Sequence, residues 1–159
     1  MLRYGLIKKE HLEDIVLVVC NILGHGKNKK AMNLLLETAS VETKSGTAKD
    51  GTIYAGMGIT QFDKMPFYDI KHRTSQRSKD AIKNALDIDI DLVEWEHLRY
   101  NPLLAMIFTR LKYIKVPAEI PSDMLGRAEY WKKWYNSELG KGTVDHYIAS
   151  SQLYYSNIG

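Results

Sequence analysis

Apolar residues recur at helical spacing through most of the chain and predict a mainly helical fold. The first helix is indicated by six of them: Leu12, Ile15, Val16, Val19, Ile22 and Leu23. Gly24 and Gly26 are expected to end it. A second, very apolar helix is predicted over residues 28–39, ending near Glu37. Pro102 lies in the first turn of a later helix, which we expect at the centre of the core.

The segment 44–61 breaks this periodicity. It contains four glycines among small and hydroxyl residues, namely Gly46, Gly51, Gly56 and Gly58. That composition is typical of a loop or short hairpin, because glycine permits tight turns and interrupts helices. Further helices are predicted over residues 69–85, 92–100, 123–138 and 143–155. No repeat or linker divides the chain, so residues 1–159 are expected to form a single domain.

Composition narrows the class of protein. The 159 residues include 45% hydrophobic and 26% charged side chains, which is globular composition. The net charge of +3 mildly favours an anionic partner, such as nucleic acid or bacterial cell wall, without choosing between them. The one cysteine, Cys20, lies in an apolar run and is expected to be buried. Neither the histidines nor the acidic run Asp87–Glu94 has the spacing of a metal site, so we expect no cofactor.

Glu37 is the first candidate for chemistry, because it directly follows three leucines. Desolvation disfavours a charged carboxylate and raises its pKa, which suits a general acid near neutral pH. The competing interpretation is a structural role, in which a glutamate at the helix end makes a structural hydrogen bond. From the chemistry of this residue alone, the structural interpretation is the stronger of the two.

Other residues could complete a catalytic site around Glu37. Asp50 follows it by 13 residues in the glycine-rich segment, and cleavage of a glycosidic bond commonly uses two carboxyl groups. Glu42 is a third carboxylate nearby, as a catalytic partner or a structural anchor. Gln61 could bind a sugar through its amide. Four aromatic residues could either stack on sugar rings or pack in the core: Tyr130, Trp131, Trp134 and Tyr135.

Five motifs occur in order over roughly residues 30–150: LLLETAS, GMGITQ, NPLLAMIFTRL, KWYNSELG and GTVDHYI. Together they resemble the lysozyme-like superfamily, in particular soluble lytic transglycosylases, goose-type lysozymes and phage endolysins. That family has a catalytic glutamate followed by Ser or Thr, then G-x-G-L-M-Q, an asparagine-led helix, A-Y-N-A-G and T-x-x-Y-V. The chain departs from it at Thr60, at Trp134 and at Ser137-Glu138.

The resemblance implies an α+β lysozyme-like fold, with a small glycine-rich lobe beside a cleft. It also implies cleavage of the β-1,4 bond between N-acetylmuramic acid and N-acetylglucosamine, with Glu37 protonating the glycosidic oxygen. In a hydrolase, Asp50 would then assist water. In a lytic transglycosylase, the sugar's own C6 hydroxyl would attack and give an anhydro product. The residues expected to bind substrate are Thr38, Tyr54, Gln61, Tyr135, Asn136 and Tyr147.

The start of the chain lacks a secretory signal, and no run approaches the roughly 20 apolar residues of a membrane span. We therefore expect synthesis in the host cytoplasm and release to the periplasmic cell wall through a holin, as for a monomeric phage endolysin. A virion-associated lysozyme is a variant of this hypothesis. The alternatives are a non-catalytic binding module of lysozyme-like shape and, less well supported by the scattered basic residues, a small DNA-binding protein.

Overall fold

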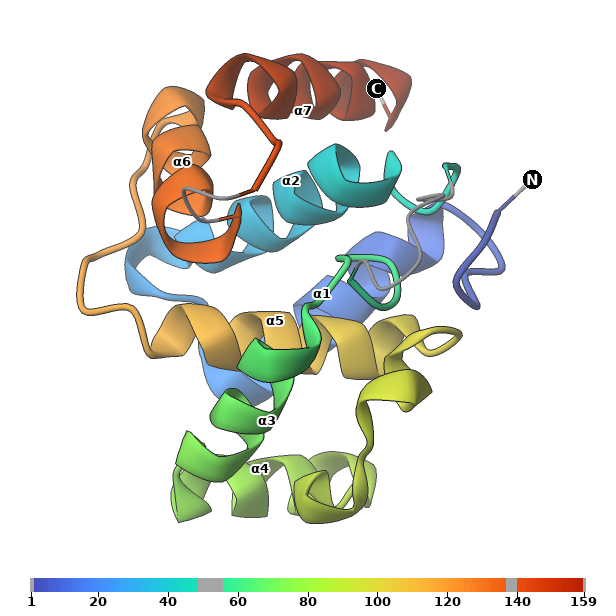
Figure 1. The fold of residues 1–159 in the computed structure, drawn as a ribbon, viewed down its shortest axis with the longest axis vertical. Helices are drawn as coiled ribbons and strands as arrows, with labels where there is room; N and C mark the ends of the chain where they lie inside the picture. Colours follow the sequence, from blue (N-terminus) through green and yellow to red (C-terminus); the bar gives the residue numbers. More distant parts are fainter. Residues whose placement is uncertain (1, 49–55, 137–139, 159) are drawn as a thin grey trace.

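The computed structural model describes residues 2–48, 56–136 and 140–158. Within these residues the chain forms seven α-helices, which confirms the mainly helical fold (Figure 1). They are α1 Glu10–Leu23, α2 Lys30–Thr43, α3 Lys64–Arg73, α4 Gln76–Leu86, α5 Pro102–Ile114, α6 Met124–Trp131 and α7 Val144–Ile158. Short 3-10 turns are η1 Lys27–Lys29, η2 Ile90–Leu92 and η3 Trp95–Leu98, and α6 continues into a π-helical turn, η4 Lys132–Asn136.

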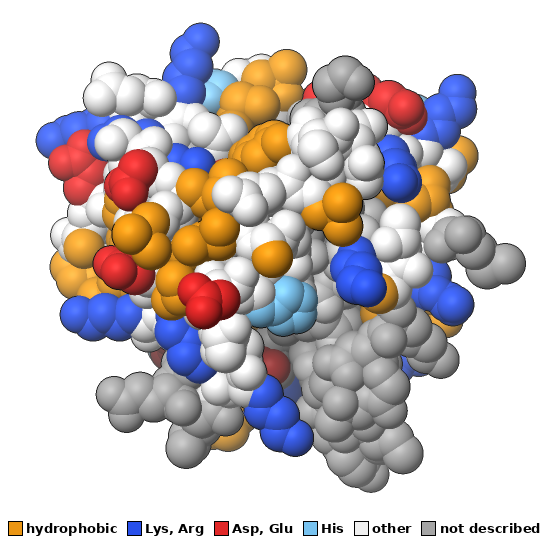
Figure 2. All heavy atoms as spheres, turned by 90° about the horizontal axis from the view of Figure 1, so that it is seen from above, with side chains coloured by type: hydrophobic (Ala, Val, Ile, Leu, Met, Phe, Trp, Pro, Cys, Tyr) orange, Lys and Arg blue, Asp and Glu red, His pale blue; other side chains and the backbone are white. Residues whose placement is uncertain are grey.

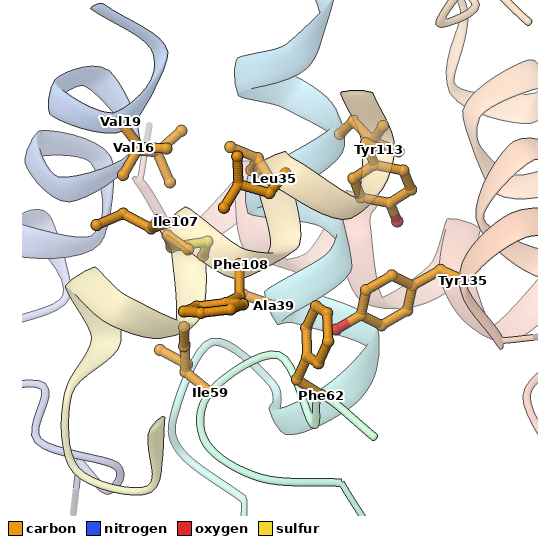
Figure 3. Packing of buried hydrophobic residues seen from close by; sticks show 14 of the residues in the cluster. Val16, Val19, Leu35, Ala39, Ile59, Phe62, Ile107, Phe108, Tyr113 and Tyr135 are labelled. Atoms are coloured by element: carbon orange, nitrogen blue, oxygen red, sulfur yellow. The ribbon is translucent and has the colours of Figure 1, made fainter. Parts of the chain in front are cut away.

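Helix α5 lies in the core, as its apolar sequence predicts. The Asn101 side chain caps its start by accepting a hydrogen bond from the Leu104 amide at 3.0 Å, and Pro102 occupies the first turn. Helix α1 packs along it. Figure 3 shows Val16 and Val19 of α1 directed toward the region between Ile107 of α5 and Leu35 of α2. These three helices bury one continuous apolar cluster.

Helix α2 lies between α1 and α5 on one side and α7 on the other (Figure 1). It ends at Thr43, six residues beyond the predicted end near Glu37. Lys44 and Ser45 adopt left-handed backbone conformations there, and their amides bond back to the Ser40 and Ala39 carbonyls. Because α2 is covered on several sides, most of its polar side chains are buried and need partners within the protein.

Two other predicted helices differ from those observed. The segment predicted as one helix over 69–85 forms α3 and α4, separated at Thr74 and Ser75. Both residues have extended backbones, and the Ser75 hydroxyl caps α4 by accepting from the Ser78 amide at 3.2 Å. The segment 92–100 forms no α-helix, and its helical residues belong to the short turns η2 and η3. In both cases local capping groups competed successfully with a continuous helix.

Of the glycine-rich segment, the structure describes residues 44–48, which follow α2, and the stretch from Gly56 onward. There the Met57 and Phe62 backbones pair as an isolated antiparallel bridge around a tight turn. This bridge is the sole β-type pairing within the described residues, so they contain no β-sheet. Among the helices of the described chain, none is both long and apolar enough to cross a bilayer.

Candidate functional site

Helix α2 carries the same dipeptide twice, Glu37-Thr38 and Glu42-Thr43. Five residues along an α-helix correspond to roughly 140° of net rotation, so the two glutamates face different surroundings. The structure shows how different these surroundings are.

Glu37 has an exposed fraction of 0%. Its carboxylate receives two hydrogen bonds from Arg127 of α6: Nε donates to Oε1 at 2.7 Å, and Nη2 donates to Oε2 at 2.9 Å. The Arg127 side chain is itself only 6% exposed, and its Nη1 donates to the Ser122 carbonyl at 2.7 Å. This is a buried, bidentate ion pair, the strongest common geometry for Arg and a carboxylate.

Two tyrosines of α7 complete the surroundings of Glu37. The Tyr147 hydroxyl donates to Oε1 at 3.0 Å, and the Tyr155 hydroxyl donates to Oε2 at 2.7 Å. Four donors thus converge on two oxygens, which is the pattern that an ionised carboxylate accepts. Burial raises the pKa of Tyr147 well above its ordinary value, and the charge of Glu37 raises it further. Burial lowers the pKa of Arg127, but Glu37 outweighs this, so the net shift is upward.

The position of Glu37 therefore differs from the expected carboxyl at the edge of a cleft. A general acid has to come within hydrogen-bond reach of the substrate oxygen, and this carboxylate is enclosed by Arg127, Tyr147 and Tyr155. The geometry matches the structural interpretation, a buried hydrogen-bonded glutamate. The reason is that α2 continues past Glu37, so this residue lies within the helix and not at its end.

Glu42 is the carboxylate near the end of α2, and it is half-buried. Its Oε1 accepts a hydrogen bond from the indole Nε1 of Trp131 at 3.1 Å. Its charge raises the pKa of Tyr135, after the larger effect of burial, and of Tyr113. Glu42 thus lies beside the aromatic residues that the sequence marks as candidates.

A lysine lies in the same region. The Lys112 Nζ is 4.4 Å from the ring centroid of Tyr135 and 5.5 Å from that of Phe62. It also donates to the Tyr135 carbonyl at 3.3 Å. Burial lowers the pKa of Lys112, while the negative charges of Asp63 and Glu42 oppose that shift. Lys112 is not among the residues expected from the sequence, because a single lysine in an apolar helix carries no motif.

The turn at Gly56–Phe62 is attached to this end of α2. Its Met57 and Phe62 backbones exchange hydrogen bonds of 2.8 and 3.0 Å, and the Thr43 hydroxyl donates to the Ile59 carbonyl at 2.7 Å. A Cβ atom at Gly56 would lie 1.9 Å from the Gln61 carbonyl oxygen, so the turn requires glycine there. Figure 3 shows Ile59 and Phe62 of this turn beside Phe108 and Tyr135.

Gln61 is 8% exposed and has a left-handed backbone with φ of 46°. Its Nε2 donates to the Gly58 carbonyl at 2.9 Å, which leaves Oε1 buried without a hydrogen-bond partner among the described residues. An unsatisfied buried oxygen costs stability, so its presence calls for an explanation, and a role in binding is one. Among the predicted substrate-binding residues that the structure describes, Gln61 is the one with a buried side-chain atom that makes no hydrogen bond.

The other predicted binding residues make internal contacts. The Thr38 hydroxyl donates to the Leu34 carbonyl at 2.7 Å and shares a 2.9 Å hydrogen bond with the Tyr113 hydroxyl. The Tyr135 hydroxyl donates to the Thr60 carbonyl at 2.7 Å, and Asn136 accepts from Lys132 at 2.8 Å. Tyr147, as described above, bonds to Glu37. Asp50 and Tyr54 lie outside the described residues.

Three of the four aromatic candidates belong to the core, with exposed fractions of 6% or less: Tyr130, Trp131 and Tyr135. Trp134 is half-buried, with Lys133 Nζ 4.9 Å from its ring centroid. Cys20 is fully buried as predicted, and burial raises its pKa to about 11, against the opposing charge of Arg110.

The described part of the chain holds no group of three or more His, Cys, Asp or Glu side chains arranged to bind a metal ion. Figure 2, which looks down on the face above α7 in Figure 1, shows basic and acidic side chains interspersed around a band of hydrophobic ones. The described side chains on this face therefore form no broad patch of one charge sign.

Comparisons of the chain with protein-family models, with curated proteins and with solved structures found no match. The likeness to lysozyme-like proteins therefore rests on the five ordered motifs.

Proposed function

We propose that this chain is a peptidoglycan-degrading glycosidase in which Glu42, in place of Glu37, is the general acid. The observation that carries this assignment is the contrast on α2: Glu37 is fully enclosed in an ion pair, whereas Glu42 is half-buried at the end of the helix. The family pattern of a helix running into Glu followed by Ser or Thr fits Glu42-Thr43, because α2 ends at Thr43.

The surroundings of Glu42 support an acid role. Partial burial and the negative end of the α2 dipole favour the neutral carboxyl, while the Trp131 N–H and the Lys112 charge favour the carboxylate. A general acid needs surroundings that support both of its protonation states, and those of Glu42 contain influences of both signs. The turn that carries Gln61 is tied to the neighbouring residue, Thr43, so its unpartnered amide oxygen is attached to the same end of the helix.

The proposed chemistry begins with the Glu42 proton. Transfer of that proton to the glycosidic oxygen would release the leaving sugar and develop positive charge on the other ring. Water, assisted by a carboxylate such as Asp50, would then complete a hydrolysis. Attack by the sugar's own C6 hydroxyl, with Glu42 taking its proton, would complete a lytic transglycosylase reaction.

The test compares Glu42→Gln with Glu37→Gln and the unaltered protein in clearing a suspension of purified peptidoglycan. Glutamine keeps the size of the side chain but cannot supply the proton. We expect Glu42→Gln to lower the rate by about 10²- to 10⁴-fold, with little change in unfolding temperature. Rates are normalised to the folded fraction from circular dichroism, because Glu37→Gln is expected to act through stability. Full clearance by Glu42→Gln would refute the assignment.

Mass spectrometry of the released fragments distinguishes hydrolysis from the lytic transglycosylase reaction. Anhydro ends would identify a lytic transglycosylase, and reducing ends would identify a hydrolase. In the second case Asp50→Asn should also lose activity while remaining folded. If the unaltered protein clears nothing but sediments with peptidoglycan, the chain is a binding module and the glycosidase proposal fails.

We include in the proposal the setting of a phage lysis enzyme that reaches the cell wall through a holin. The mild net charge of +3 is compatible with an anionic polymer as substrate. Expression in bacteria with and without a co-expressed holin tests this part, and lysis that is independent of the holin would contradict it.

A further inference from the structure

We infer that Trp131 is a positioning residue for Glu42, and that its indole N–H sets the orientation of that carboxyl and the pH at which it gives up its proton. The consequence for activity rests on the proposed function. The contact itself does not, and it can be tested separately.

Trp131 is held firmly. It is 1% exposed, and its ring packs against Tyr147 with a centroid distance of 5.3 Å and an interplanar angle of 41°. A Cβ atom at Gly142 would lie 2.4 Å from the far edge of the indole, so the backbone there closes directly on the ring. An indole packed on these sides has little room to turn, and its N–H stays directed at Glu42 Oε1, 3.1 Å away.

The Glu37–Arg127 ion pair fixes the register in which this contact forms. Arg127 precedes Trp131 by four residues on α6, and Glu37 precedes Glu42 by five on α2. At a rise of about 1.5 Å per residue, these spacings are roughly 6 and 7.5 Å, so the two contacts form successive cross-links between the helices. The enclosed glutamate therefore helps to place the half-buried one.

The pH consequence depends on the charged and titratable groups that the described residues place around Glu42. Lys112 and Tyr113 of α5 and Tyr135 of η4 interact with its charge, and Asp63 acts on Lys112 and Tyr135. Lys112 and the Trp131 donor both favour the ionised carboxylate. Removing the indole donor therefore favours the protonated acid, and a general acid works only while it is protonated.

The first test replaces Trp131 by Phe and, to keep the shape, by 3-benzothienylalanine, in which sulfur takes the place of the N–H. We expect the falling, high-pH limb of the peptidoglycan rate profile to move upward by about 0.5 to 1 pH unit in both. A merely structural role would lower the rate at every pH without moving that limb. A limb that stays in place in the isosteric variant would overturn the inference.

The second test needs no activity. The indole ¹H–¹⁵N NMR signal of Trp131, assigned by its loss in Trp131→Phe, should shift with pH as Glu42 titrates and should stop doing so in Glu42→Gln. Trp95 is the internal control, because its indole donates to the Phe62 carbonyl at 2.8 Å, a group that does not titrate. A Trp131 signal that responds to pH equally in Glu42→Gln would overturn the inference.

The two proposals can thus fail independently. If Glu42→Gln retains full peptidoglycan activity while the Trp131 signal follows Glu42, the contact is real and the glycosidase assignment of Glu42 is wrong. If Glu42→Gln is inactive but the pH response of the Trp131 signal is the same with and without the Glu42 carboxyl group, the acid assignment holds and the positioning role is wrong.

Discussion

Two positions on one helix, Glu37 and Glu42, show how surroundings decide what a glutamate does. Glu37 lies in the middle of α2 and faces α6 and α7, and the hydrogen bonds that its carboxylate accepts within the described chain come from Arg127, Tyr147 and Tyr155. Glu42 lies near the end of the same helix, half-buried, beside an indole N–H. The side chain and the following threonine are the same in both places.

The two glutamates differ because a buried carboxylate and a partly exposed one need different surroundings to be stable. A fully buried carboxylate is stable only if paired, and once paired with an arginine in bidentate geometry it is fixed in place. Removing one partner of such a pair destabilises the junction of three helices, because the remaining charge is left uncompensated. A carboxylate at a helix end retains contact with solvent, so its proton can exchange.

The largest effect on stability is expected from breaking the ion pair. Glu37→Gln or Arg127→Met leaves an uncompensated buried charge or an unsatisfied partner, and each should lower the free energy of unfolding by about 3–5 kcal/mol. The double variant Glu37→Met/Arg127→Met removes both charges and should lose less than the sum of the single losses. Urea unfolding followed by circular dichroism measures all three.

The control for this prediction is a surface pair of the same chemical type. Arg73 and Asp69 lie 3.0 Å apart on α3 with both side chains more than half exposed. Arg73→Met should cost less than about 1 kcal/mol. A comparable loss in Arg73→Met and Arg127→Met would show that burial does not distinguish Glu37 from an ordinary surface carboxylate.

A smaller effect is expected from the phenols around Glu37, and it depends on pH. Burial, then the charge of Glu37, raises the pKa of Tyr147 above its unfolded value of about 10. The folded protein therefore keeps a proton that the unfolded chain loses, so this stability is complete below pH 10 and declines above it. Each such group contributes a fall of about 1.4 kcal/mol per pH unit.

Tyr147→Phe is the matched variant. At pH 7 it removes one hydrogen bond to a charged group and should cost about 1.5–3 kcal/mol. Between pH 10 and 11 its stability should fall less steeply than that of the unaltered protein, by about 1.4 kcal/mol per pH unit. Urea unfolding at several pH values in this range measures how steeply the free energy of unfolding falls with pH in each protein. Equal slopes in the two proteins would show that the pKa of Tyr147 is not raised in the folded state.

The sequence predicts the helical core well, because apolar spacing in α1 and α5 depends on burial alone. It also predicts that the glutamate after Leu34, Leu35 and Leu36 lies partly out of water, and in the structure its burial is complete. The error lies at the end of α2. Ala39 and Val41 are compatible with a helix, so the sequence gives no reason to end it before them. The helix ends because Lys44 and Ser45 adopt a left-handed backbone conformation, which is uncommon for lysine and serine and is not predicted by either residue type.

The predicted helix end near Glu37 is what places that residue at the edge of a cleft in the sequence-based prediction. With the helix end at Thr43, the second Glu-Thr pair becomes the one that meets the glycine-rich segment. Arg127 was missed for a different reason, because it lies 90 residues from Glu37 and no local pattern joins an arginine on one helix to a carboxylate on another. Long-range pairing of this kind appears only once the helices are placed together.

The smallest effects are expected from the two threonines, and they test the same contrast within one residue type. The Thr38 hydroxyl joins α2 to Tyr113 at 2.9 Å, whereas the Thr43 hydroxyl joins it to the Ile59 carbonyl of the turn at 2.7 Å. Valine keeps the shape but removes the hydroxyl, so Thr38→Val and Thr43→Val should each lower the free energy of unfolding by about 1 kcal/mol. If the end of α2 is the functional end, Thr43→Val should also reduce the peptidoglycan rate per folded molecule several-fold, while Thr38→Val leaves it within a factor of two. A larger rate loss in Thr38→Val than in Thr43→Val would place the working end of the helix at Glu37 after all.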